Sequence, residues 1–156
     1  MTKALKEGMK APSFSLPSDG GGNIALKDCL GKTLVLYFYP KDDTSGCTRE
    51  AIDFSALTKD FKKAGATVIG VSKDSVAAHD KFRKKHDLSV SLLSDAEGKM
   101  VAAYGVWVEK SMYGRKYMGI ERATFLIDAK GVIQKVWHKV KVPGHAAEVL
   151  AAAKAL

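Results

Sequence analysis

The chain has 156 residues, of which 46% are hydrophobic and 27% charged, and its formal net charge is +8. No run approaches the roughly 18 apolar residues of a membrane span, the first residues contain no apolar core of a secretory signal, and two cysteines are too few for a disulfide framework. We therefore expect a single domain over residues 1–156, located in the cytoplasm, where thiols stay reduced.

The first half of the chain predicts alternating strands and helices. Residues 13–28 favour two short strands around Asp19–Gly22, a loop that suits a hairpin. The near-continuous apolar run from Thr33 to Tyr39 predicts a strand covered on both faces. Apolar residues at three- and four-residue spacing then predict a helix from Thr48 to Lys63. A second buried strand is expected from Ala66 to Ser72.

The second half predicts a helix, a short strand, a short helix, a β-hairpin and a last helix. Asp74 or Ser75 is suited to cap the first of these helices, and its Phe82 is expected to face the core. The other elements are the strand "VSLLS", a helix from Glu97 to Tyr104, the strands "ATFLID" and "VIQKVWH" joined at Asp128–Gly131, and the helix "GHAAEVLAAAKAL". This mixed order predicts an α/β, thioredoxin-like fold with an N-terminal β-hairpin and an inserted helix.

The densest positive charge lies in "KFRKKH", Lys81 to His86. No aromatic stacking cluster or nucleic-acid motif accompanies it. A solvated helix end, where cations complement the helix dipole, is the favoured interpretation. We expect neither a nucleic acid nor a membrane as a partner.

Cys47 follows the buried strand and a polar loop, Lys41 to Gly46, and lies at the predicted start of a helix. Free N–H groups and the helix dipole favour a thiolate there, and cysteines at such positions or beside cations can have pKa values of about 3.5–7.5. Arg49 and Lys41 are candidate cations close in sequence. Thr44 could cap the helix or direct its hydroxyl at whatever the sulfur attacks.

Other interpretations of this cysteine are a small buried apolar side chain, a dithiol exchanger or a nucleophile for acyl transfer. "CTRE" places Glu50 where a dithiol motif has its second cysteine, which argues against the exchanger. Acyl transfer would need a histidine base. None of the four histidines has a local signature, and each is expected to be an ordinary surface or capping residue; they are His79, His86, His138 and His145. They also lack metal-ligand spacing, so we expect no zinc site.

The stretches "YFYPKDDTSGCT" and "YMGIERATFLID" resemble the active-site segment and a second signature of the peroxiredoxins, in the bacterioferritin-comigratory or peroxiredoxin Q subfamily. The similarity runs from "APSFSL" to "PGHAAEVL". It implies a thiol peroxidase that reduces hydrogen peroxide and organic hydroperoxides through a sulfenic acid on Cys47, and that requires no metal or organic cofactor. Thr44 corresponds to the hydroxyl that orients the peroxide, Arg122 to the arginine that stabilises negative charge, and Pro40 to the proline that shields the site.

The chain departs from this family at the resolving cysteine. Many relatives carry it five residues after the peroxidatic one, where Ile52 stands, or in the next helix, which contains none here. Cys29 lies at the far end of the strand from Cys47, roughly 23 Å away at about 3.3 Å per residue, too far for a disulfide. Ser45 stands where the subfamily often has proline.

We therefore expect a one-cysteine cycle. The reductant would be thioredoxin, glutaredoxin or a small thiol, and the resemblance suggests a monomer. A basic redox-sensing or chaperone-like binding protein that uses Cys47 as a switch is the alternative.

Overall fold

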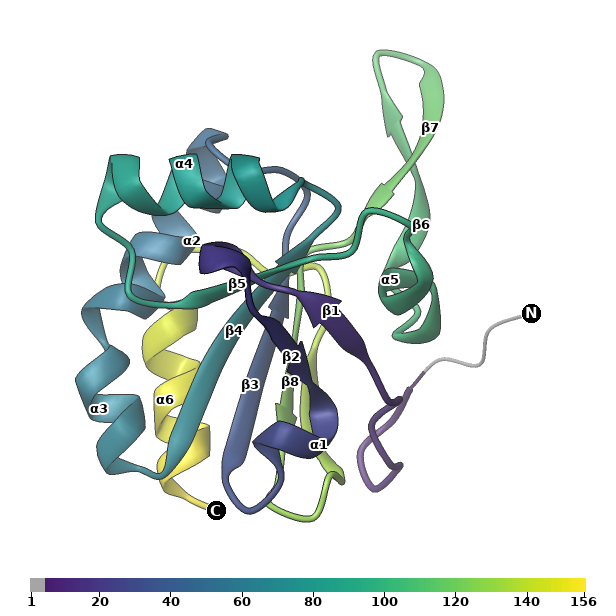
Figure 1. The fold of residues 1–156 in the computed structure, drawn as a ribbon. Coiled ribbons are helices and arrows are strands. Elements are labelled where there is room, and N and C mark those ends of the chain that lie inside the picture. The colour runs from purple at the N-terminus through teal and green to yellow at the C-terminus, as the bar shows by residue number, and fades with distance from the viewer. Residues whose placement is uncertain (1–4) are drawn as a thin grey trace.

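The computed structural model describes residues 5–156; residues 1–4, the start of the segment in which we expect no secretory signal, lie outside them. A five-stranded sheet with the order β5-β4-β3-β8-β9 forms the centre (Figure 1). Its strands are β3 (Thr33–Phe38), β4 (Ala66–Ser72), β5 (Ser91–Ser94), β8 (Ala123–Ile127) and β9 (Ile133–Trp137). The first three run parallel, β8 is antiparallel to β3, and β9 is antiparallel to β8. The prediction of a mixed sheet is therefore confirmed.

Two layers cover the faces of this sheet (Figure 1). One face packs against the four helices α2 (Ser45–Ala56), α3 (Thr58–Lys63), α4 (Val76–His86) and α6 (His145–Lys154). The other packs against α1 (Leu26–Cys29), α5 (Lys99–Ala103) and the predicted N-terminal hairpin of β1 (Ser15–Pro17) and β2 (Asn23–Ala25), joined by a 3-10 turn, Asp19–Gly21. Strand β3 thus lies between two hydrophobic cores.

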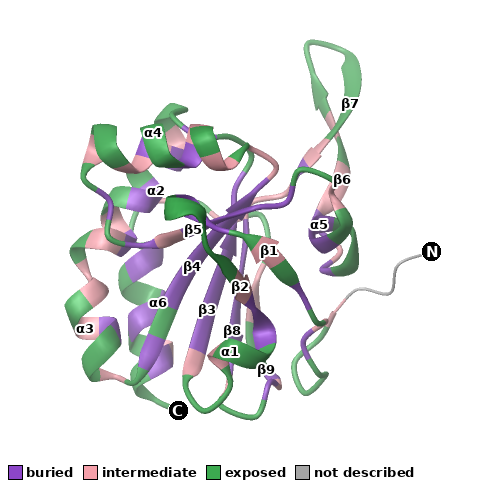
Figure 2. Cartoon of the chain, in the orientation of Figure 1, coloured by how far each residue is buried: buried purple, intermediate pink, exposed green. Residues whose placement is uncertain are grey.

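Alternation along β3 builds both cores. Leu34, Leu36 and Phe38 point into one hydrophobic cluster, and Val35 and Tyr37 into the other. All of them are buried, as the purple centre of Figure 2 shows. Since a fully buried large apolar side chain contributes about 1.5–3 kcal/mol, this strand stabilises both layers.

Position 70 of β4 must be glycine because the ring of Tyr37, its partner on β3, occupies the space of a side chain there. A Cβ added at Gly70 would lie 2.6 Å from Cζ of the Tyr37 ring. This ring stacks on Phe54 of α2, with 4.7 Å between the ring centroids. The glycine therefore lets an aromatic ring join the sheet to the helix that carries Cys47.

The prediction of one helix from Thr48 to Lys63 is wrong about where the helix starts and about its continuity. Helix α2 begins at Ser45, and the backbone breaks at Leu57, where φ is −101° and ψ is 5°, before α3 begins. Cys47 therefore lies inside the first helical turn instead of just before it. Helix α4 does begin as predicted, with the Ser75 side chain accepting a hydrogen bond from the Ala78 N–H.

A second hairpin, β6 (Trp107–Met112) and β7 (Arg115–Ile120), was not predicted. It extends away from the sheet (Figure 1). Its turn places Tyr113 and Gly114 at φ values of 52° and 78°, the conformation of a type I′ hairpin turn, which usually has asparagine or aspartate before the glycine. Arg122 follows this hairpin and precedes β8.

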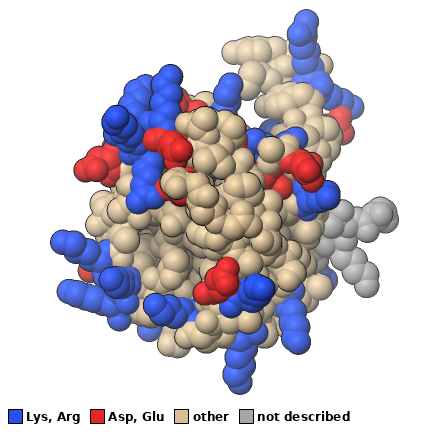
Figure 3. Space-filling model, in the orientation of Figure 1, with Lys and Arg blue, Asp and Glu red and all other residues tan. Residues whose placement is uncertain are grey.

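Positive charge is spread over the surface and is dense around α4 (Figure 3). The last turn of α4 holds Arg83, Lys84, Lys85 and His86, and Phe82 is buried beneath them as expected. This arrangement fits the interpretation of a solvated basic helix end. Among residues 5–156, no helix is long and apolar enough to cross a membrane.

Candidate active site

Cys47 is the third residue of α2, with Thr44 at the N-cap position. The cysteine is only 1% exposed and belongs to the hydrophobic cluster under the helices. The first turn of a helix has N–H groups without intrahelical partners and carries the positive end of the dipole. Negative charge on sulfur is stabilised at this place.

The Arg122 guanidinium reaches the sulfur from the segment between β7 and β8. Its Nη2 donates to Cys47 Sγ at 3.3 Å, and its Nη1 donates to Glu50 Oε1 at 2.7 Å. Burial opposes the charge on Arg122, but the combined attraction of Glu50 and Cys47 outweighs it and raises the pKa of the guanidinium. A Cβ on Gly46 would lie 3.1 Å from Arg122 Nη2, so the glycine permits this close approach.

Glu50 is a residue of the site that the sequence interpretation missed. It is 1% exposed, and its Oε2 has no hydrogen-bond partner among the described residues. Burial raises the pKa of its carboxyl to about 7, although Arg122 acts in the opposite direction. Its position one helical turn after Cys47 was the available signal, because residues three apart share a helix face.

The raised pKa of Glu50 predicts how stability depends on pH. Because the folded chain holds this proton more strongly than the unfolded chain, stability is lost as pH rises from about 4.5 through about 7. The Glu50→Gln variant cannot ionise at this position, so we expect its stability relative to the parent chain to increase by about 2.5 kcal/mol from pH 5 to pH 8. Urea unfolding at both pH values measures this.

Asp53→Asn is the matched control for that experiment, since Asp53 lies in the same helix and is partly exposed beside Arg49. It should show no comparable gain. A stability difference between Glu50→Gln and the parent chain that is equal at both pH values would contradict the burial of an ionisable Glu50.

Thr44 and Pro40 lie in the exposed loop before Cys47. The Thr44 hydroxyl donates to the Lys41 carbonyl at 2.9 Å, and its side chain makes no capping hydrogen bond to α2. Thr44 therefore occupies the cap position without acting as a side-chain cap. Pro40 directly follows the buried Tyr39 and is exposed.

The two cations close in sequence do not approach the sulfur. Arg49 is 72% exposed in its side chain and pairs with Asp53 at 3.4 Å. Lys41 is likewise exposed. Arg122, which is 75 residues away in sequence, takes the position beside Cys47.

Two of the four histidines are buried, so the expectation of ordinary surface residues is wrong for them. His79 is 0% exposed and His145 is 6% exposed. Burial lowers the pKa of His145 to about 4, and its Nε2 is paired with the Thr124 hydroxyl at 2.7 Å. None of the hydrogen bonds found within residues 5–156 joins a histidine to Cys47, so the general base of an acyl-transfer site is not assembled.

Cys29 lies at the other end of β3 and on the other face of the sheet. It ends α1 and packs against the cluster that contains Leu34 and Phe38, whereas Cys47 belongs to the opposite cluster. Its thiol donates to the Ala25 carbonyl at 3.7 Å, and burial raises its pKa. The two thiols are therefore separated by the sheet itself as well as by the length of β3.

The chain matches the model of the AhpC/TSA family over residues 8–136. The chain belongs to this family, as a peroxiredoxin. It is 50% identical to peroxiredoxin Bcp of Bacillus subtilis over 146 residues, which are 94% of this chain and 93% of that protein. The predicted resemblance to the Bcp or peroxiredoxin Q subfamily is confirmed.

Solved structures agree with this assignment. A cysteine-to-serine mutant of Xylella fastidiosa PrxQ superposes with a TM-score of 0.93 at 41% identity, covering 98% of each chain. A structure of Xanthomonas campestris bacterioferritin comigratory protein, from work on its alkyl peroxide reduction activity, has a TM-score of 0.87 at 48% identity and covers 91% of this chain and 90% of that one. The predicted thioredoxin-like fold of this peroxiredoxin is confirmed, and the chain is a thiol-dependent peroxidase.

Proposed function

We propose that this peroxiredoxin reduces hydrogen peroxide and small organic hydroperoxides with Cys47 as the nucleophile. The observation that carries the proposal is the 3.3 Å contact between Arg122 Nη2 and Cys47 Sγ. The thiolate attacks one peroxide oxygen, so that an S–O bond forms as the O–O bond breaks. Sulfur is oxidised by two electrons to a sulfenic acid, and the leaving oxygen takes a proton to become water or alcohol.

Arg122 and Thr44 are the groups that we propose to act on the peroxide. Charge moves from sulfur to the leaving oxygen during the attack, and donors placed along this path stabilise it. Arg122 already donates to the sulfur. The Thr44 hydroxyl donates its hydrogen to the Lys41 carbonyl, so its lone pairs are free to accept the hydrogen of a hydroperoxide.

Pro40 is proposed to shape the entrance. It has no backbone N–H to solvate, and its fixed φ restrains the loop that leads from β3 to Thr44. The alkyl peroxide reduction studied in the Xanthomonas campestris relative supports organic hydroperoxides as substrates of this chain as well.

The sulfenic acid is proposed to be resolved by an outside thiol. Cys29 lies on the opposite face of the sheet, and the chain has no third cysteine. The outside thiol displaces water from the sulfenic acid to form a mixed disulfide, which a second thiol reduces. Thioredoxin, glutaredoxin and small thiols are the candidate reductants.

Intact mass after one equivalent of peroxide tests this cycle. We expect Cys29→Ser to retain the oxidation rate and the turnover of the parent chain to within about twofold, because Cys29 only packs against the core. Both proteins should gain one oxygen without a thiol donor, form a mixed disulfide with one equivalent of a small thiol, and return to the reduced mass with excess donor. Thioredoxin, glutaredoxin and a small thiol are compared as donors in the same assay.

A loss of two mass units in the parent chain, absent from Cys29→Ser, would reveal an intramolecular disulfide and overturn the one-cysteine cycle. The peroxidase activity itself would stand in that case. Dimers on a nonreducing gel would instead point to a second copy as the resolving partner.

We further propose that residues 1–156 act as one domain, as a monomer and in the cytoplasm. Both hydrophobic clusters share the same five-stranded sheet, which supports a single folding unit. A half-buried Cys29 and a buried Cys47, both free thiols, suit a reducing compartment.

A further inference from the structure

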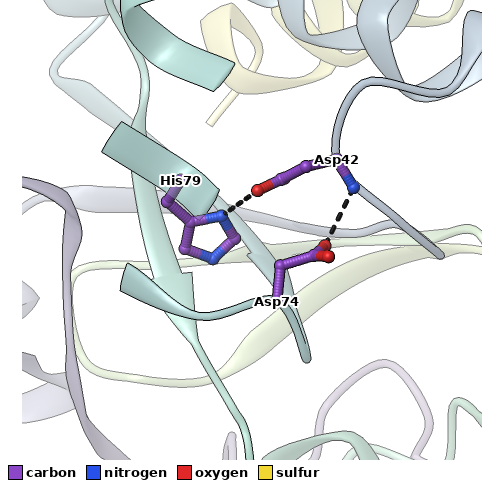
Figure 4. A group of neighbouring side chains, drawn as sticks. All are labelled: Asp42, Asp74 and His79. Atoms are coloured by element: carbon purple, nitrogen blue, oxygen red, sulfur yellow. Dashed lines mark hydrogen bonds and ion pairs between the residues drawn. The ribbon is translucent and has the colours of Figure 1, made fainter. Parts of the chain in front are cut away.

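A buried carboxylate lies in the exposed loop that leads to the active site. Lys41, Asp43 and Thr44 are exposed, but Asp42 between them is buried. Its side chain points away from solvent and toward α4 (Figure 4). A carboxylate is removed from water only where partners replace its hydration.

Both carboxylate oxygens and the backbone N–H of Asp42 have such partners. Oδ1 accepts from the Tyr39 hydroxyl at 2.5 Å, and Oδ2 lies 2.6 Å from Nδ1 of His79. The backbone N–H of Asp42 donates to Asp74 Oδ2 at 2.8 Å (Figure 4). The loop is thus tied to the end of β3, to α4 and to the segment after β4. Asp42, Asp74 and His79 lie close enough to hold a metal ion, but the hydrogen bonds of this network already engage the atoms that would bind it.

The contacts of His79 favour its positively charged form. Its Nε2 lies 2.8 Å from the Leu93 carbonyl, which can only accept, so Nε2 holds a hydrogen. Nδ1 faces the Asp42 carboxylate, and a hydrogen on Nδ1 completes an imidazolium–carboxylate pair at 0% and 6% side-chain exposure. The hydrogen bond that replaces water at Asp42 Oδ2 therefore requires the hydrogen on His79 Nδ1.

We propose that His79 is a positioning residue for the peroxidase reaction, which holds through Asp42 the loop that carries Thr44 and the first turn of α2 with Cys47. The inference rests on the proposed roles of Thr44 and Cys47. Asp42 is two residues before Thr44 and five before Cys47. Without the proton on Nδ1, a lone pair of His79 faces the carboxylate, and the loop loses its buried anchor.

The sign of the pH dependence follows from the groups that face His79. Burial lowers its pKa, but Asp42, the Leu93 carbonyl and Asp74 together raise it above the ordinary value. The titratable Tyr39 ring also lies beside His79, and burial keeps its hydroxyl protonated by raising its pKa. The anchor is complete below about pH 6.5 and is lost as pH rises through the raised folded value.

The test compares His79→Gln with the full parent chain in stopped-flow oxidation by hydrogen peroxide from pH 6 to pH 10. We expect the ratio of the parent rate constant to the variant rate constant to be about 10 at pH 6, since misplaced reacting groups cost this much or more. The ratio should fall toward 1 as His79 loses its proton.

His86→Gln is the matched control. His86 lies in the same helix and pairs with Asp43 of the same loop, but at the surface, with 22% and 42% side-chain exposure. Its ratio should stay within about twofold of 1 at every pH, as for exposed pairs. A His79→Gln ratio that is independent of pH would overturn the proposal, because a merely structural role predicts a constant factor.

Hydrogen exchange of the parent chain gives a second readout that needs no variant. Protection of the amides of residues 41–47, corrected for the intrinsic pH effect, should fall at high pH while that of β3 and β4 is unchanged. Protection that does not fall overturns the proposal, also where His79→Gln fails to fold. Hydrogen exchange needs no peroxide, and neither does a measurement of the alkylation rate of Cys47 by iodoacetamide. Both therefore test whether His79 anchors the loop, even if the proposed peroxide chemistry at Thr44 and Cys47 fails.

Discussion

Replacing Cys47 by serine is expected to abolish peroxide reduction. A serine hydroxyl has nearly the shape of the thiol, but it does not ionise near neutral pH and does not accept an oxygen from a peroxide. Because the proposed catalytic step is the attack of this one sulfur, no other residue of the site can replace it. Peroxide consumption with a thiol donor should fall to the level of the uncatalysed reaction.

The same variant separates the peroxidase from the other hypotheses for Cys47. Its fold should be intact, as circular dichroism and urea unfolding would show, because the substitution removes little buried apolar volume. Residual peroxide consumption above the uncatalysed rate would show that Cys47 is not the nucleophile. A binding or chaperone-like activity that persisted in Cys47→Ser would indicate a function carried by another surface.

Replacing Arg122 is expected to have the second largest effect. Its guanidinium contacts Cys47 and Glu50 at the same time, and a lysine ammonium cannot reproduce this fork. We expect Arg122→Lys to lower the second-order rate constant of Cys47 oxidation by about 10²–10³, the typical cost of removing one donor from a charge-stabilising site. Stopped-flow oxidation measures this directly.

Stability must be measured beside the rate, because removing the guanidinium leaves the buried Glu50 unpaired. The double variant Arg122→Lys with Glu50→Gln should regain stability without regaining the rate. Arg49→Lys is the matched control, since Arg49 is two residues from Cys47 yet exposed; its rate constant should stay within about twofold of the parent value. An oxidation rate that is normal in Arg122→Lys would contradict the proposed stabilisation of charge.

The central strands could be predicted from the sequence because both of their faces are buried. Strand β4 was predicted with its observed bounds, Ala66–Ser72. The β6–β7 hairpin could not be predicted in this way: its outer residues are exposed, and the apolar pattern of a half-buried strand is absent. The start of α2 also differed, because Ser45 and Gly46 are not typical of a helix interior.

The candidate site was predictable only where its residues lie close together in sequence. Cys47 and Thr44 were identified from their place at a helix start, whereas Arg122 was named through resemblance alone. Glu50 and His79 were missed for one reason: a charged residue in an amphipathic helix is usually solvated. Glu50 follows the buried Cys47 by three positions, and His79 precedes the buried Phe82 by three. This spacing marks both residues as members of the buried face of their helix.

The sheet that separates Cys29 from Cys47 has a kinetic consequence. In the proposed one-cysteine cycle, no thiol of the same molecule can capture the sulfenic acid, because Cys29 lies on the other face of the sheet; the sulfenic acid therefore persists until an outside thiol collides with it. During a sudden excess of oxidant, throughput is set by the supply of donor, and enzyme waiting in the oxidised form is open to further, irreversible oxidation of its sulfur.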